Sequence, residues 1–154
     1  MKLPFRLLGC IPFLMVLIQS VPLAAASTVV AWGSGLYGLT NTPAGLTGAV
    51  AVAAGSQHVV ALKNDGTVVT WGFNGFGQRN EPAGLTGLIA ISAGHDHTVA
   101  LRTNGTVVAW GRNDYGQASV PVGLSGVTAV AAAFWGYHTL ALKNDGPRKF
   151  FSVN

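Results

Sequence analysis

The sequence predicts an all-β fold, a partial β-propeller of about three blades, and two observations support it. Trp32, Trp71 and Trp110 are spaced 39 residues apart, and each begins a Trp-Gly pair. Each repeat also contains short runs rich in valine and alanine, such as "HVVALK" and "TVVTWG", which are typical of strands. Three to four antiparallel strands in every ~40 residues describe one propeller blade.

Residues 1–26 have the pattern of a secretory signal peptide and are expected to be removed. Lys2 and Arg6 precede a short apolar stretch, and the small residues Ala24 and Ala26 follow it. A basic start, an apolar middle and a small-residue cleavage site are the three parts of such a signal. An uncleaved membrane anchor is the alternative interpretation. We therefore expect a secreted or periplasmic protein that begins after Ala26.

The charge of the mature chain is low. The nine Lys and Arg and the five Asp and Glu give the whole sequence a net charge of +4. Two of the nine basic residues lie in the leader, so seven remain against five acidic residues, a net charge of +2. Such a surface has no basic patch for nucleic acid, and we expect no nucleic-acid partner. The single cysteine, Cys10, also lies in the leader, so packing and hydrogen bonds alone must hold the domain.

The repeat domain, residues 27–146, is expected to begin in the middle of a blade. Its opening word, "TVVAWG" at residues 28–33, corresponds to a third strand. Two fuller copies follow, and each joins two apolar runs through Asn-Asp-Gly at 64–66 or Thr-Asn-Gly at 103–105. Asp-Gly and Asn-Gly between apolar runs predict hairpins, because both residues tolerate positive φ. No helix is expected after the leader.

The third copy departs from the pattern. His138 follows His97 by 41 residues instead of 39, because its loop carries two additional residues. Where a third strand should follow, residues 147–154 instead have the sequence "PRKFFSVN". This segment is either a degenerate strand or the foreign tail of a truncated or frame-shifted gene. In the fuller copies, a short fourth strand is expected after Gln78 and Gln117, which would make the blades four-stranded.

Several repeated segments resemble the regulator of chromosome condensation repeat family. They are "AGSQHVVALKNDGTVVTWGFNGFGQ", "AGHDHTVALRTNGTVVAWGRNDYGQ" and a weaker "FWGYHTLALKNDG", and the resemblance covers residues 29–146. The sequence of these segments is most similar to that of bacterial exported members of the family, including a propeller-type inhibitor of β-lactamase. The resemblance implies a propeller, typically seven-bladed, that binds other proteins through loops on one face. Three blades are too few for a closed propeller, so self-association through open blade edges is expected.

The residues predicted to bind a partner are those that differ between repeats. Because strand direction alternates, the loop before the second strand and the loop after the third strand share one face. Repeated residues build the scaffold, whereas variable loop residues are free for recognition or simply drift. Phe76 and Tyr115 occupy a repeated aromatic position and are expected to pack instead. The predicted partner-binding residues are Phe73, His95, Asp96, Arg112, Asp114, Phe134, Trp135 and Tyr137.

Catalytic and metal sites are not expected. The repeated His58, His97 and His138 lie at equivalent positions around a ring, so they should bond backbone groups and not converge on zinc. The tryptophans should pack between blades. His95 and His97 lack a fixed third metal ligand. No nucleophile elbow, carboxylate pair or phosphate loop is present, so we expect no enzyme activity, no cofactor and no metal.

The function that these observations favour is that of an exported protein–protein interaction module. It would use the variable loops of one face to bind a protein whose identity the sequence leaves open. Two alternatives stand beside it. One is a non-functional fragment of a longer seven-bladed protein, and the other is a protein inhibitor of an extracellular or periplasmic enzyme.

Overall fold

The computed structural model describes residues 27–144 and has eight strands in three antiparallel sheets. A single turn of 3-10 helix, η1 (Leu36–Gly38), precedes the strands, although no helix is expected from the sequence. The all-β prediction is confirmed. The three sheets, in order, are β1 (Ala49–Ala54), β2 (His58–Lys63) and β3 (Val68–Gly72); β4 (Leu88–Ala93), β5 (His97–Arg102) and β6 (Val107–Gly111); β7 (Val127–Ala132) and β8 (Thr139–Lys143).

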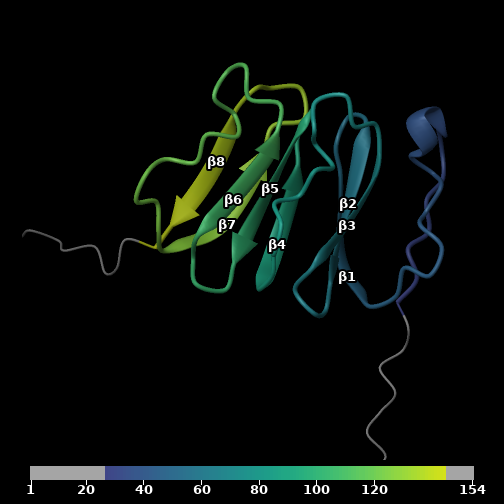
Figure 1. The fold of residues 1–154 in the computed structure, drawn as a ribbon, viewed down its shortest axis with the longest axis horizontal. Coiled ribbons are helices and arrows are strands. Elements are labelled where there is room, and N and C mark those ends of the chain that lie inside the picture. Colours follow the sequence, from purple (N-terminus) through teal and green to yellow (C-terminus); the bar gives the residue numbers. More distant parts are fainter. Residues whose placement is uncertain (1–26, 145–154) are drawn as a thin grey trace, which may run out of the picture.

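The sheets stand in a row, each packed against its neighbours in chain order (Figure 1). β4 contacts β2 and β1 of the first sheet, and β7 contacts β5 and β4 of the second. Residues 27–48 lie at one end of the row, and β8 lies at the other (Figure 1). This arrangement of consecutive antiparallel sheets confirms the prediction of partial propeller blades.

Glycine turns join the second and third strands, as the Asp-Gly and Asn-Gly pairs predict. Gly66 and Gly105 both have φ of 75°, a conformation that side chains with a Cβ atom rarely adopt. These turns fix the register, which pairs Val60 with Thr70 in the first sheet and Val99 with Ala109 in the second. Each hairpin therefore repeats the same geometry in successive sheets.

Two tryptophans are buried, Trp110 between the first two sheets and Trp71 between the first sheet and the amino-terminal segment. Trp110 packs with Leu62 of β2 and Leu88 of β4, so its indole joins the first sheet to the second. Its Nε1 donates to the carbonyl oxygen of Gln78 at 3.0 Å. Trp71 donates in the same way to Leu39, at 2.9 Å. The expectation of packing between blades holds for Trp110. Trp71 packs instead against the amino-terminal segment, and Trp32 is 85% exposed.

Two of the repeated histidines, His58 and His97, bond to side chains of the next sheet, which corrects the expectation that their rings satisfy backbone groups. Nε2 of His58 lies 2.9 Å from Oγ1 of Thr98, and Nε2 of His97 lies 3.0 Å from Oγ1 of Thr139. Burial lowers the pKa of His58 to about 4, and burial also lowers the pKa of His97. These neutral rings therefore tie successive sheets together.

Two strand predictions are wrong. The segments after Gln78 and Gln117 form turns, so the first two sheets have three strands each and no fourth. Residues 28–33, expected as a third strand, are not part of any described sheet. A strand needs a paired neighbour for its backbone groups. This segment packs against the first sheet through Val29, but it pairs with no described strand. The expected leader, residues 1–26, and the tail, residues 147–154, lie outside the described residues.

Candidate functional site

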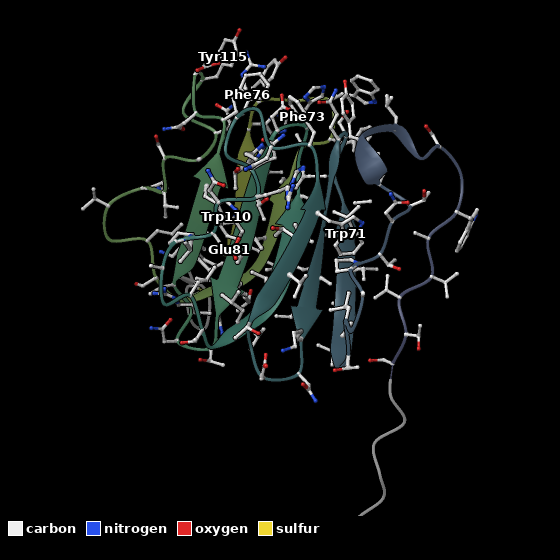
Figure 2. All side chains as sticks on the ribbon, turned by 45° about the vertical axis from the view of Figure 1, so that its right-hand side comes forward. Trp71, Phe73, Phe76, Glu81, Trp110 and Tyr115 are labelled. Carbon is white, nitrogen blue, oxygen red and sulfur yellow. The ribbon has the colours of Figure 1, made fainter. Side chains whose placement is uncertain are left out.

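Five loops gather at one end of the sheets and form a surface that we call the loop face. Phe73, Phe76 and Tyr115, which come from two different sheets, lie together at this end (Figure 2). The alternation of strand direction places the loops there, as the sequence predicts. The loop face consists of residues 55–57, 73–78, 94–96, 112–117 and 133–138.

Arg112 is the centre of the loop face. Its guanidinium carbon lies 4.6 Å from the ring centre of Phe76, 5.2 Å from that of Tyr137 and 5.9 Å from that of Tyr115. Tyr115 and Tyr137 stack on each other with ring centres 4.6 Å apart. The rings come from all three sheets. Cation–π contacts of this kind contribute about 0.5–1 kcal/mol each at exposed sites, so the cluster orients the guanidinium.

Two carboxylates hold Arg112 from different sides. Its Nε donates to Oδ2 of Asp114 at 2.6 Å, and its Nη1 lies 3.5 Å from Oδ2 of Asp96. The bond to Asp114 is the main reason that the pKa of Arg112 is raised. The side chain of Asp96 is only 2% exposed, whereas that of Asp114 is 62% exposed. The buried carboxylate of Asp96 therefore helps to position Arg112 from within the protein, whereas the carboxylate of Asp114 faces solvent.

His95 shares the buried carboxylate. Its Nδ1 lies 2.7 Å from Oδ2 of Asp96, the same oxygen that faces Arg112. The His95 ring in turn lies 5.8 Å from the ring of Trp135 and 6.3 Å from that of Tyr137, measured between ring centres. One buried carboxylate thus contacts both a cation and an imidazole that lie against the aromatic residues of the third sheet.

The aromatic surface extends to both sides of this centre. Phe134 and Trp135 meet edge to face at 5.4 Å, and Trp135 is 80% exposed. On the other side Phe73 lies 6.3 Å from Phe76 and 5.0 Å from Tyr37, again between ring centres. The face is therefore a continuous band of aromatic rings with one fixed cation in it. Large exposed aromatic surfaces rimmed by polar groups are typical of sites that bind protein.

All eight residues predicted from the sequence lie on the loop face. Phe76 and Tyr115 join them there, and Tyr37 of η1 packs against the edge of the face through Phe73. Phe76 is 45% exposed and Tyr115 is 65% exposed, although their repeated position predicts packing. Both rings do pack, but against Arg112 and other rings at the surface instead of inside a sheet. The place of Tyr37 before Gly38 matches Phe76 before Gly77, and that spacing is the signal that identifies it.

The described residues contain no group of three His, Cys, Asp or Glu side chains that could hold a metal ion. Over the same part of the chain, no helix has the length and apolar character needed to cross a membrane. What residues 27–144 offer is a rigid sheet scaffold with recognition residues on its loops, which is the arrangement of a repeat-built binding protein.

Comparisons with known proteins agree with this class. Residues 49–78 and 88–117 match the regulator of chromosome condensation (RCC1) repeat. The two matches span the first two sheets together with the loops that carry Phe73 and Arg112. No curated protein matches the chain.

Solved structures show the same fold. Prp20p of Saccharomyces cerevisiae, described with its binding properties to Gsp1p and histones, is 24% identical over 64% of this chain, with a TM-score of 0.53. The same yeast protein bound to Kap60 is 26% identical over 64% of this chain, also with a TM-score of 0.53. The chain spans only 29% and 28% of those two structures. The chain thus has the fold of a segment of an RCC1-type propeller.

Proposed function

We propose that this protein is a protein-interaction module of the RCC1 repeat family and that it binds its partner through the loop face. The observation that carries the proposal is the fixed guanidinium of Arg112, which lies over rings from three sheets on the same face as the exposed Trp135. Arginine and large aromatic residues account for most of the binding energy in protein interfaces. The yeast relative, which binds Gsp1p and histones, supports the general mode and not the partner.

Trp135 is the expected anchor. Burial of one large aromatic side chain contributes roughly 2–3 kcal/mol. An exposed ion pair such as that of Arg112 and Asp114 contributes about 0–1 kcal/mol. Because the ring of Trp135 is already 80% exposed, its removal should weaken binding and leave the fold intact.

Photocrosslinking tests this proposal. A photoreactive phenylalanine analogue replaces Trp135 in the full chain, and the matched control carries the same analogue at Val122, which is fully exposed but lies outside the loop face. We expect a discrete adduct with another protein from position 135 and none from 122. Arg112→Ala in the crosslinking variant should reduce the yield, because the rings lose the cation that orders them.

The stability of Trp135→Ala separates recognition from packing. A melting temperature within about 2 °C of the unsubstituted chain agrees with a binding residue, since surface substitutions change stability by about 0.5 kcal/mol or less. A large drop in melting temperature would show that Trp135 stabilises the fold. Equal adducts from positions 135 and 122 would also contradict the proposal.

Export belongs to the same proposal, because it decides which proteins the loop face meets. The leader pattern at residues 1–26 favours cleavage after Ala26 and a secreted or periplasmic location. An inhibitor of an extracellular or periplasmic enzyme is then one form that the interaction can take. Mass spectrometry of the protein from an exporting host should give a chain that begins at Ser27. A membrane fraction that retains residues 1–26 would favour the anchor.

A further inference from the structure

Within residues 27–144, the two ends of the row of sheets differ from a full blade in complementary ways. At the amino-terminal end, Val29 packs against the cluster around Trp71, just as Val68 of β3 packs against the cluster around Trp110. The carbonyl oxygen of Leu39 accepts the indole bond of Trp71, as that of Gln78 does for Trp110. Residues 28–39 therefore occupy the place of a third strand and its following loop, on the outer side of the first sheet.

This amino-terminal segment repeats a strand of the second sheet. Residues 28–33 read "TVVAWG", and residues 106–111, which contain β6, read the same six letters. In β6 the tryptophan is 6% exposed, whereas Trp32 is 85% exposed and Val30 is 72% exposed. The same sequence is thus buried and paired in one place and exposed in the other.

Among residues 27–144, the third sheet has two strands and an opening where a third strand would lie. A cavity of about 410 Å³ lies beside β6 and β8 and is lined in part by Val107, Leu124 and Ala141. By the repeat spacing, these three residues are the counterparts of residues 68, 85 and 100. Those residues, Val68, Leu85 and Ala100, surround Trp110. The lining of the cavity therefore matches the residues that surround the buried indole of Trp110.

The polar partner of an indole is also in place. The carbonyl oxygen of Gln78 accepts bonds from Oγ1 of Thr98 at 2.9 Å and from Nε1 of Trp110 at 3.0 Å. The carbonyl oxygen of Gln117, which lines the cavity, accepts a bond from Oγ1 of Thr139 at 2.7 Å. Among the described residues, no indole N–H donates to the carbonyl oxygen of Gln117 as that of Trp110 does to Gln78.

We propose that residues 28–33 of a second copy of this chain add to the third sheet as its third strand, with Trp32 of that copy in the cavity. Residues 28–33 of the same chain cannot reach this position, because residues 27–48 and β8 lie at opposite ends of the row (Figure 1). The register follows from β5 and β6, where Val99 pairs with Ala109. It places Ala31 of the second copy opposite Leu140.

The same contact covers the outer face of β8. Leu140 and Leu142 are 62% and 65% exposed, whereas their counterparts in β5, Val99 and Leu101, are 0% and 1% exposed beneath the third sheet. A donated strand brings its own first sheet with it, so that sheet covers the two leucines. The head-to-tail contact closes when two copies supply six sheets, a number within the range of known propellers.

Engineered cysteines test the register in the full chain carrying Cys10→Ser, which then contains no other cysteine. Leu140→Cys combined with Ala31→Cys places two thiols directly opposite each other, so an intermolecular disulfide should form in high yield. Leu140→Cys combined with Val30→Cys is the matched control, because adjacent residues of a strand point to opposite faces. Equal yields, or no disulfide in either variant, overturn the proposal.

Light scattering after gel filtration tests the assembly itself. The expected mass is twice that of one chain. Trp32→Ala should shift the protein to the monomer, whereas Trp135→Ala, which removes an exposed tryptophan from the loop face, should leave the dimer unchanged. A monomeric unsubstituted chain, including one whose own residues 147–154 fill the cavity, overturns the proposal. A dimer that persists in Trp32→Ala does so as well.

Discussion

At the scale of single residues, the same side chain takes different roles according to its depth. Asp96 and Asp114 both face Arg112, yet only Asp96 is buried, so it orders the cation and imidazole while Asp114 meets solvent. The sequence places both on the loop face, because strand alternation determines which end a loop lies on. The sequence does not show which of the two carboxylates is buried. Burial depends on how the loops that carry His95 and Arg112 pack around Asp96.

The buried His58 should make stability depend on pH. Its ring is fully buried, and burial lowers its pKa from 6.5 in the unfolded chain to about 4. The unfolded chain therefore binds the proton more readily, so the stability due to neutral His58 is present above pH 6.5 and lost as pH falls through about 4. The loss should reach roughly 3 kcal/mol, measured as the free energy of urea unfolding at each pH.

Two variants test whether His58 causes this dependence of stability on pH. His58→Gln should reduce the slope between pH 6.5 and 4, and His97, whose pKa burial also lowers, accounts for part of what remains. His138→Gln removes a histidine from the equivalent but exposed position of the third sheet and is the matched control. An unchanged slope in His58→Gln would mean that other groups cause the loss of stability.

At the scale of elements, the 39-residue period predicts the strands well where each strand has a neighbour. The hairpins of the first two sheets follow from their Asp-Gly and Asn-Gly turns. Residues 28–33 show the limit, because they repeat the letters of residues 106–111 and yet join no described sheet. Local sequence gives a segment its propensity, but a strand also needs a partner for its backbone groups. A repeat pattern does not show whether that partner is present.

Contacts between sheets depend on a small polar site that the sequence does not reveal. Oγ1 of Thr98 bonds to Nε2 of His58 in the first sheet and to the carbonyl oxygen of Gln78. All three residues are fully buried. The first sheet has Val59 at the position equivalent to Thr98, so the repeat tolerates both residue types sterically.

Thr98→Val should weaken the junction between the first and second sheets. The substitution keeps the shape of the side chain and leaves the ring of His58 and the carbonyl of Gln78 with one buried bond fewer each. We expect a loss of about 1–3 kcal/mol in the free energy of urea unfolding at pH 7.5. Thr128→Val, at an exposed position of β7, is the control and should change it by less than about 0.5 kcal/mol. Equal losses would show that the buried bonds contribute nothing specific.

At the scale of the whole molecule, the main contacts between sheets in residues 27–144 join neighbours in the row, so the two ends differ from the middle. Val99, Ala100 and Leu101 of β5 are 0–1% exposed because sheets cover them on both sides. In β8 the equivalent leucines are more than 60% exposed. The number of repeats predicts the order of the sheets. The third repeat in the sequence does not show what covers the outer face of β8. Stability in such a row depends on the contacts between adjacent sheets.

Hydrogen exchange should therefore report both the gradient along the row and the covering of its end. In a dilute solution, where strand donation is dissociated, amides of β5 should exchange most slowly and those of β8 fastest, because local opening follows burial. Raising the protein concentration should then slow exchange in β8 and leave β5 unchanged, since a donated strand and its sheet protect β8 alone. Trp32→Ala should abolish this dependence on concentration. Slow exchange in β8 at every concentration would mean that a segment of the same chain already covers it.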